Sequence, residues 1–166
     1  MATVKLQGDP CNTNGDLPAI GAVAPDFNLV DGDLNDLGLN DFAGKKKIIY
    51  IVPSLDTPVC QTSTKKFNEH ASSHDDTVMI IVSADLPFAM GRFCGVENVK
   101  NVKTLSMMRS RNFAKDYGVL LIDGPLAGIT TRALLVLDAD NKVIHTELVA
   151  DITQEPDYDA ALAALA

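Results

Sequence analysis

The sequence predicts an α/β domain in which helices cover both faces of a mixed central sheet. From the middle of the chain onward, short apolar runs rich in β-branched residues alternate with amphipathic segments. The chain has 166 residues, and its hydrophobic content of 46% is enough material for a single core. We therefore expect one domain over residues 1–166, without a long linker.

The first elements of this pattern are a strand, a helix and a second strand. Lys47–Val52 (KIIYIV) and Thr77–Ser83 (TVMIIVS) are nearly continuous apolar runs, which are typical of buried strands. The segment 58–71 between them predicts a helix, because small and apolar residues recur at four-residue intervals from Val59 to Ala71. A strand, helix and strand in this order favour a parallel pair.

Two shorter helices are expected in the next part of the chain. The first covers residues 88–95 and the second residues 109–117. Gly118 follows the second helix, and glycine readily adopts the left-handed conformation in which many helices end. We therefore expect this helix to end at Tyr117.

The C-terminal part predicts a hairpin and a closing helix. Ala133–Leu137 and Val143–Val149 flank a polar turn over residues 138–142. Pro156 can begin the last helix, whose apolar residues up to Leu165 have helical spacing. This order of elements is that of a thioredoxin-like fold, and the turn-rich residues 1–40 read as an N-terminal hairpin extension.

Charge and hydropathy exclude several partner classes. A formal net charge of -8 argues against nucleic acid and anionic lipid, which bind proteins through excess positive charge. The basic run Lys45–Lys47 is short, and we interpret it as the solvated lead-in to a strand. No apolar stretch approaches the ~18 residues that span a bilayer. The N-terminus lacks a secretory signal, so we expect a cytoplasmic protein; the periplasm stays open, because a processed precursor would look the same.

The cysteines and histidines do not form a metal-binding pattern. Cys11, Cys60 and Cys94 are too few for a disulfide-stapled scaffold, and their spacing matches no zinc motif. His70 and His74 can share a helix face, but no third ligand lies near them, so we interpret them as solvated side chains. We expect neither a metal nor a cofactor.

Cys60 occupies a position that favours reactivity. It follows a buried strand at the start of a helix, where α/β folds usually place their sites. Thr57 suits the helix N-cap and Pro58 the first helical turn, so Cys60 would be the third helical residue. Free backbone N–H groups and the helix dipole favour a thiolate there. Helix position alone leaves the alternative that Cys60 is a small buried hydrophobe.

The neighbours of Cys60 carry a family resemblance. The segment Pro53-x-x-x-Thr57-x-x-Cys60 resembles the PxxxTxxC active-site signature of the peroxiredoxins. The resemblance covers nearly the whole chain and narrows to the bacterial thiol peroxidases, which are atypical two-cysteine peroxiredoxins. It extends over residues 83–89 (SADLPFA), 92–95 (RFCG), 123–128 (DGPLAG), Arg132 before ALLVLD, and 152–158 (ITQEPDY).

This resemblance implies a role for each matching residue. Cys60 would be the peroxidatic cysteine and Cys94 the resolving one, while Thr57, Arg132 and Pro53 complete the site. Donors aimed at both peroxide oxygens lower the barrier to displacement, an arginine stabilises the thiolate, and the proline shields it from water. Without the resemblance, Arg132 would be read as a surface arginine and Cys94 as a buried helix residue.

The implied activity is that of a thiol-specific peroxidase for hydrogen peroxide and organic hydroperoxides. It would proceed through a Cys60 sulfenate and an intramolecular Cys60–Cys94 disulfide, with thioredoxin as reductant and a homodimer as the assembly. Cys11 has no role in this scheme and is interpreted as structural. Two alternatives remain: a thioredoxin-like redox sensor or binding module, and a cysteine hydrolase, which would need a histidine beside Cys60.

Overall fold

The computed structural model describes residues 1–71 and 73–166. A seven-stranded sheet has the order β4-β3-β7-β6-β5-β8-β9. Strands β5, β6 and β7 are parallel, and the remaining neighbours in this sheet pair antiparallel. The predicted mixed central sheet is therefore confirmed. Its strands are β3 (Leu29–Val30), β4 (Asp36–Leu37), β5 (Lys46–Ile51), β6 (Thr77–Ser83), β7 (Lys103–Ser106), β8 (Ala133–Leu137) and β9 (Val143–Leu148).

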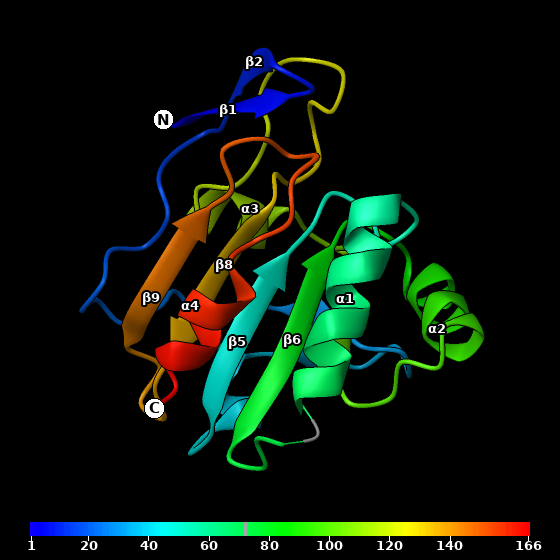
Figure 1. The fold of residues 1–166 in the computed structure, drawn as a ribbon, viewed down its shortest axis with the longest axis vertical. Helices are drawn as coiled ribbons and strands as arrows, with labels where there is room; N and C mark the ends of the chain where they lie inside the picture. The colour runs from blue at the N-terminus through cyan, green and yellow to red at the C-terminus, as the bar shows by residue number, and fades with distance from the viewer. Residues whose placement is uncertain (72) are drawn as a thin grey trace.

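Helices lie on both faces of the sheet, as Figure 1 shows, with α1 and α4 in front of it and α3 behind. Alternate residues of β5 serve the two faces, because successive side chains of a strand point in opposite directions. Ile49 and Ile51 join a buried cluster with residues of α3, whereas Ile48, Tyr50 and Val52 join one with residues of α1, α2 and α4. The helices are α1 (Pro58–Ala71), α2 (Pro87–Val96), α3 (Asn112–Asp116), α4 (Tyr158–Ala163) and the 3₁₀ helix η1 (Leu39–Phe42).

Most helices begin and end within about two residues of the positions that the sequence predicts. Helix α1 spans the predicted residues, and α2 begins one residue earlier than expected, with Pro87 in its first turn. Helix α4 begins at Tyr158 rather than Pro156 because the Asp157 side chain accepts a hydrogen bond from the Ala160 N–H and caps the helix there.

Helix α3 is shorter than predicted at its N-terminal end. Arg109 stays outside it and binds Asp36 of β4 through an Nη1–Oδ1 contact of 2.7 Å. After the helix, Gly118 has the expected left-handed conformation, with φ of 68°. A Cβ at this position would lie 2.1 Å from the backbone oxygen of Asp16, so the close approach of the two segments also requires glycine.

Two features of the sheet differ from the sequence prediction. Strand β7 was not predicted, because only Leu105 and Ser106 of its four residues are buried and the run is too short for a clear period. The interpretation of Lys45–Lys47 as solvated is wrong for Lys47, which is buried in β5. Its Nζ donates to the Lys45 carbonyl oxygen at 2.8 Å, and burial lowers its pKa.

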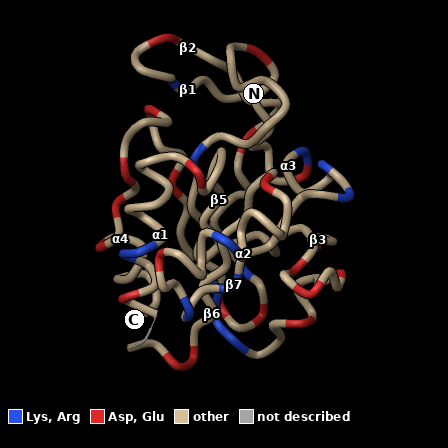
Figure 2. The backbone as a smooth tube through the Cα atoms, turned by 90° about the vertical axis from the view of Figure 1, so that its right-hand side faces the viewer, with Lys and Arg blue, Asp and Glu red and all other residues tan. Residues whose placement is uncertain are grey.

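The N-terminal hairpins are confirmed, and they take different places. Strands β1 (Thr3–Leu6) and β2 (Asp9–Asn12) form a separate hairpin, which both Figure 1 and Figure 2 place at one end of the molecule. Strands β3 and β4 instead form one edge of the main sheet. Figure 2 also shows acidic positions spread over the whole trace, with lysines and arginines scattered among them. Within the described residues, no helix has the length and hydropathy that crossing a bilayer would require.

Candidate active site

Cys60 is the third residue of α1 and lies just after the loop that leaves β5. Its side chain is buried, in the cluster between the sheet and helices α1, α2 and α4. The Gln61 N–H donates to the Thr57 carbonyl oxygen at 2.9 Å, which places Thr57 at the start of the helix as predicted. The cysteine therefore has the helix-terminal setting that the sequence indicates.

Arg132 approaches Cys60 from the neighbouring strand. It directly precedes β8, which pairs antiparallel with β5 so that Ala133 lies opposite Ile51. Only 2% of Arg132 is exposed, and its Nη1 lies 3.1 Å from the Cys60 sulfur. A buried guanidinium needs a partner to offset the loss of hydration, and an ionised sulfur is such a partner. The contact thus places a permanent cation directly beside the Cys60 sulfur.

The orientation of Arg132 depends on a hydrogen-bond chain that the sequence analysis missed. Its Nη1 also donates to the Tyr50 hydroxyl at 2.8 Å, and its Nε donates to the Ile152 carbonyl oxygen at 2.8 Å. Ser63 donates its proton to the Val59 carbonyl oxygen at 2.6 Å. The 2.8 Å contact between Tyr50 and Ser63 is therefore a donation from the tyrosine, which leaves the phenol oxygen free to accept from Arg132.

Tyr50 remains a neutral phenol throughout the physiological range. Burial raises its pKa to about 12, although the nearby Arg132 acts in the opposite direction. A neutral phenol on the same arginine nitrogen does not compete with the sulfur for the positive charge. Tyr50 can therefore orient the guanidinium without neutralising it.

Thr57 and Pro53 lie in the loop between β5 and α1. Pro53 is buried, and Thr57 is half-buried, with its hydroxyl donating to the Ser54 carbonyl oxygen at 3.0 Å. The loop is fixed from outside by Asp85, which accepts hydrogen bonds from the Ser54 hydroxyl and the Leu55 N–H, both at 2.7 Å. Of the five residues with predicted roles, the structure thus brings Cys60 and Arg132 into direct contact and places Thr57 and Pro53 in the preceding loop.

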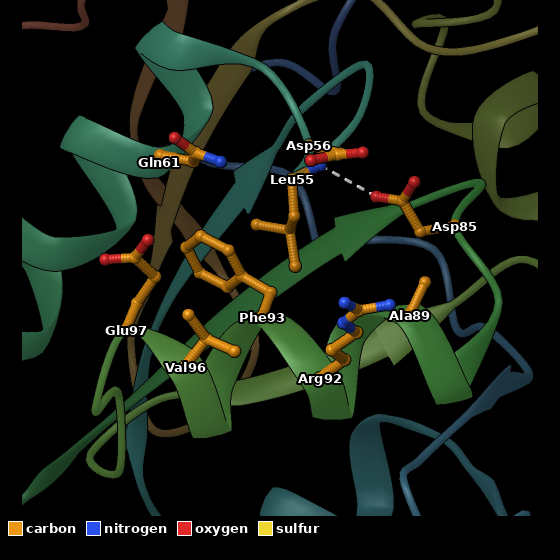
Figure 3. A pocket seen from close by; sticks show the side chains of 9 residues that line it. All are labelled: Leu55, Asp56, Gln61, Asp85, Ala89, Arg92, Phe93, Val96 and Glu97. Atoms are coloured by element: carbon orange, nitrogen blue, oxygen red, sulfur yellow. Dashed lines mark hydrogen bonds between the residues drawn. The ribbon is translucent and has the colours of Figure 1, made fainter.

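A pocket of about 450 Å³ lies beside this loop, as Figure 3 shows. Leu55 of the loop points toward α2 across it, and Asp56 and Gln61, the neighbour of Cys60, also line it. Phe93, the neighbour of Cys94, lines the opposite side. The pocket therefore lies between the segments that carry the two cysteines. Its remaining lining residues are Asp85, Ala89, Arg92, Val96 and Glu97.

Cys94 lies in α2 and is half-buried. It packs against the same apolar cluster that contains Cys60, and all cysteines of the chain are free thiols. Burial raises the pKa of Cys94, while a hydrogen bond with Thr104 acts in the opposite direction. The structure thus places the two cysteines on one side of the sheet, each in a folded helix.

Cys11 belongs to a different part of the molecule. It lies in β2, where it pairs with Val4 of β1, and it is buried in a small cluster that also contains Leu121 and Ile152. Burial raises the pKa of its thiol, and the charges of nearby acidic residues add to this shift. These surroundings are consistent with the structural interpretation of Cys11.

The site offers no support for the hydrolase alternative. The polar side-chain atom on the Cys60 sulfur is a guanidinium nitrogen, whereas the His74 ring binds the His70 carbonyl oxygen at 3.0 Å and His145 lies in β9. Among the described residues, no group of three or more histidine, cysteine or acidic side chains is arranged to hold a metal ion.

The sequence and the structure of the chain both resemble those of known proteins. A family model described as Redoxin matches residues 19–162. The chain is 50% identical over 165 residues to a thiol peroxidase of Mycobacterium bovis, and the match covers 99% of each chain. A peroxiredoxin-like protein from Aquifex aeolicus has a TM-score of 0.92 at 40% identity, covering 99% of this chain and 96% of the other. For a thiol peroxidase from Chromobacterium violaceum, the TM-score is 0.91 at 29% identity, with 98% and 94% covered.

These matches extend over nearly the full length of the chain and confirm the fold class that the sequence predicts. They also agree in activity class, because the curated relative and one of the solved structures are named as thiol peroxidases. The chain therefore belongs to the Redoxin family and, within it, to the thiol peroxidases.

Proposed function

We propose that this thiol peroxidase reduces hydrogen peroxide and organic hydroperoxides with Cys60 as the attacking thiolate. The observation that carries the proposal is the 3.1 Å contact between Arg132 Nη1 and the Cys60 sulfur, made where both side chains are buried. A fixed cation beside a helix-terminal cysteine favours the nucleophilic form of the sulfur.

In the first step, the Cys60 thiolate attacks one peroxide oxygen and the O–O bond breaks. The sulfur is oxidised to a sulfenic acid, and the other oxygen leaves with the bonding electron pair and takes up a proton as alcohol or water. Arg132 and the Cys60 N–H donate to the peroxide as charge develops on the leaving oxygen. The Thr57 hydroxyl, which donates to Ser54 in the resting site, can turn toward the peroxide by rotation about a single bond.

In the second step, the Cys94 thiolate attacks the Cys60 sulfenic acid. An S–S bond forms, the S–O bond breaks, and the oxygen leaves as water after protonation. Because both cysteines lie in folded helices, the step requires local unwinding at the start of α1 and in α2. Such unwinding also exposes Cys94 and removes the burial that raises its pKa.

A dithiol protein of the thioredoxin type would then reduce the disulfide by exchange, as the family resemblance implies. The resemblance also implies a homodimer that forms through the surface near the active-site loop. Three apolar side chains support a contact there: Leu86, Phe88 and Val96 are 51%, 67% and 75% exposed, at or beside α2. Sedimentation velocity at micromolar concentration tests this part, and a monomer at all concentrations would refute it without affecting the chemistry.

The decisive assay for the activity is NADPH oxidation coupled through thioredoxin reductase and thioredoxin. We expect turnover with both hydrogen peroxide and an alkyl hydroperoxide in the wild type, and none in Cys60→Ser. The redox-sensor alternative predicts a different result, in which the Cys60–Cys94 disulfide forms but peroxide is not consumed in repeated cycles.

A further inference from the structure

We propose that Asp85 is a positioning residue for peroxide reduction, since its carboxylate fixes the loop that leads into Cys60. The inference rests on the proposed function of Cys60. Asp85 binds the loop and the central strands rather than the sulfur or Arg132, and it lies between β6 and α2 rather than in the signature segment. Its effect on the chemistry is therefore exerted through the loop.

The carboxylate makes two bonds to consecutive loop residues. Its Oδ1 accepts from the Ser54 hydroxyl at 2.7 Å, and its Oδ2 accepts from the Leu55 N–H at 2.7 Å, the bond drawn in Figure 3. Ser54 in turn organises the next residues: its hydroxyl oxygen accepts from the Asp56 N–H at 3.1 Å, and its carbonyl accepts from the Thr57 hydroxyl at 3.0 Å. Ser54 thus links Asp85 to Thr57, since its side chain binds the one and its backbone carbonyl binds the other.

Asp85 is itself held by the central strands. Its Oδ2 also accepts from the Ser83 hydroxyl at 2.7 Å, and its carbonyl oxygen accepts from the Ser106 hydroxyl. Ser83 and Ser106 lie opposite each other in the parallel pair β6 and β7. The carboxylate therefore anchors the loop, which has little regular structure of its own, to the central sheet.

The hydrogen-bond donors around the Asp85 side chain favour a carboxylate at this position. All three groups on the carboxylate are donors, and an ionised carboxylate is the side-chain group that offers only acceptors. Asparagine has the same shape but a single acceptor oxygen, which can serve Leu55 and Ser83 while its amide faces Ser54. Asparagine should hence restore part of what alanine removes.

The position of Asp85 also connects the loop to the second cysteine. Two residues after Asp85, Pro87 begins α2, which carries Cys94. The same carboxylate thus ties the segment before Cys60 to the segment before Cys94. The loop and the start of α2 are fixed to each other while the enzyme awaits peroxide.

The test is the rate of a single oxidation of Cys60 by hydrogen peroxide, followed by quenched flow and mass spectrometry of the reduced full-length protein. We expect Asp85→Ala to lower the second-order rate constant about tenfold or more, because small misplacements of reacting groups are costly. Asp85→Asn should recover part of the rate. Ser54→Ala, which removes one bond to the loop and leaves the carboxylate in place, should also be slower than the wild type.

A matched control is Asp31→Ala. Asp31 is a buried carboxylate that accepts from the N–H groups of Asp33 and Asn35, both at 2.9 Å, and pairs with Lys103. It directly follows β3, which is separated from β5 by β7 and β6. Its loss should lower the urea midpoint without changing the oxidation rate by more than about twofold.

The outcomes separate the two proposals. If Cys60→Ser is inert to peroxide while Asp85→Ala and Ser54→Ala both react at the wild-type rate, the positioning role is wrong and the proposed function stands. The positioning role is equally wrong if Asp85→Ala is slowed no more than Asp31→Ala. If Cys60→Ser consumes peroxide as fast as the wild type, the proposed function itself fails. An oxidation rate constant that is lower in Asp85→Asn than in the wild type, and lower still in Asp85→Ala, supports the inference.

Discussion

Tyr50 and Arg132 lie 82 residues apart in the chain and meet through a 2.8 Å hydrogen bond in the buried site. The same arginine nitrogen contacts the Cys60 sulfur at 3.1 Å. Because the guanidinium is also held at Nε by the Ile152 carbonyl oxygen, two fixed acceptors set its position before peroxide arrives. The orientation of the cation toward the sulfur is therefore preorganised.

Tyr50→Phe should weaken this preorganisation. The change removes an acceptor from Arg132 and a donor from Ser63, so we expect the free energy of unfolding to fall by about 1–3 kcal/mol and Cys60 oxidation to slow. Urea denaturation and quenched-flow oxidation measure the two effects. The matched control is Tyr117→Phe, which loses a 2.7 Å bond to the Pro25 carbonyl oxygen on the other face of the sheet. Equal slowing in both variants would contradict a specific role for Tyr50.

The phenol of Tyr50 also predicts a loss of stability at alkaline pH. Its pKa is about 12 in the folded protein because it is buried, against about 10 in the unfolded chain. Below pH about 10 both states keep the proton; between about 10 and 12 only the unfolded state loses it, so the free energy of unfolding falls by up to roughly 3 kcal/mol. Urea midpoints against pH should therefore fall less steeply in Tyr50→Phe. Identical slopes would show that Tyr50 does not contribute.

Arg132→Met should slow the oxidation of Cys60 by roughly tenfold or more, because the cation beside the sulfur is lost while much of the apolar stem remains. Stopped-flow oxidation by hydrogen peroxide provides the measurement. Arg109→Met is the control, since Arg109 pairs with Asp36 at an exposed edge of the sheet. An oxidation rate in Arg132→Met that equals the rate in Arg109→Met would refute the electrostatic role.

Cys60→Ser should abolish peroxidase activity, whereas Cys11→Ser should leave it nearly intact. Only Cys60 combines the start of a long helix with a contact to Arg132, whereas Cys11 lies in the N-terminal hairpin and packs in a separate cluster. The coupled NADPH assay distinguishes the variants. An inactive Cys11→Ser protein with intact folding would overturn the site assignment.

Cys94→Ser should consume about one peroxide per protein and then stop, because the Cys60 sulfenate has no intramolecular partner. Mass spectrometry of the oxidised wild type should find a Cys60–Cys94 disulfide within one chain. Full turnover of Cys94→Ser with thioredoxin would contradict the resolving role. So would a bond found only between chains, or one that includes Cys11.

The sequence predicts the contiguous part of the site better than the rest. Pro53, Thr57 and Cys60 lie within one strand–loop–helix unit, whose structure follows from local periodicity and capping. Arg132 is 72 residues away from Cys60, and only the family resemblance indicates its role. No local pattern specifies a contact that depends on the pairing of β5 with β8.

Tyr50 and Asp85 were missed for the same reason, although each leaves a signal. A tyrosine within the apolar run KIIYIV has a hydroxyl that needs a partner once it is buried. An aspartate just after a buried strand lies at the edge where parallel sheets place their sites. Both signals indicate a polar network but not its members, because the partners come from distant segments.

Alternate residues of β5 face two different cores, so the register of this strand determines the active site as well as the fold. Tyr50 faces Cys60 and Arg132 only because Ile49 and Ile51 face the opposite core. Insertion or deletion of one residue in β5 would exchange the faces, turning an isoleucine toward the sulfur and the phenol into an aliphatic layer. Exchange of the aliphatic residues of β5 for one another therefore leaves the two faces in place, whereas a change in the length of the strand between Lys46 and the Pro53 loop does not.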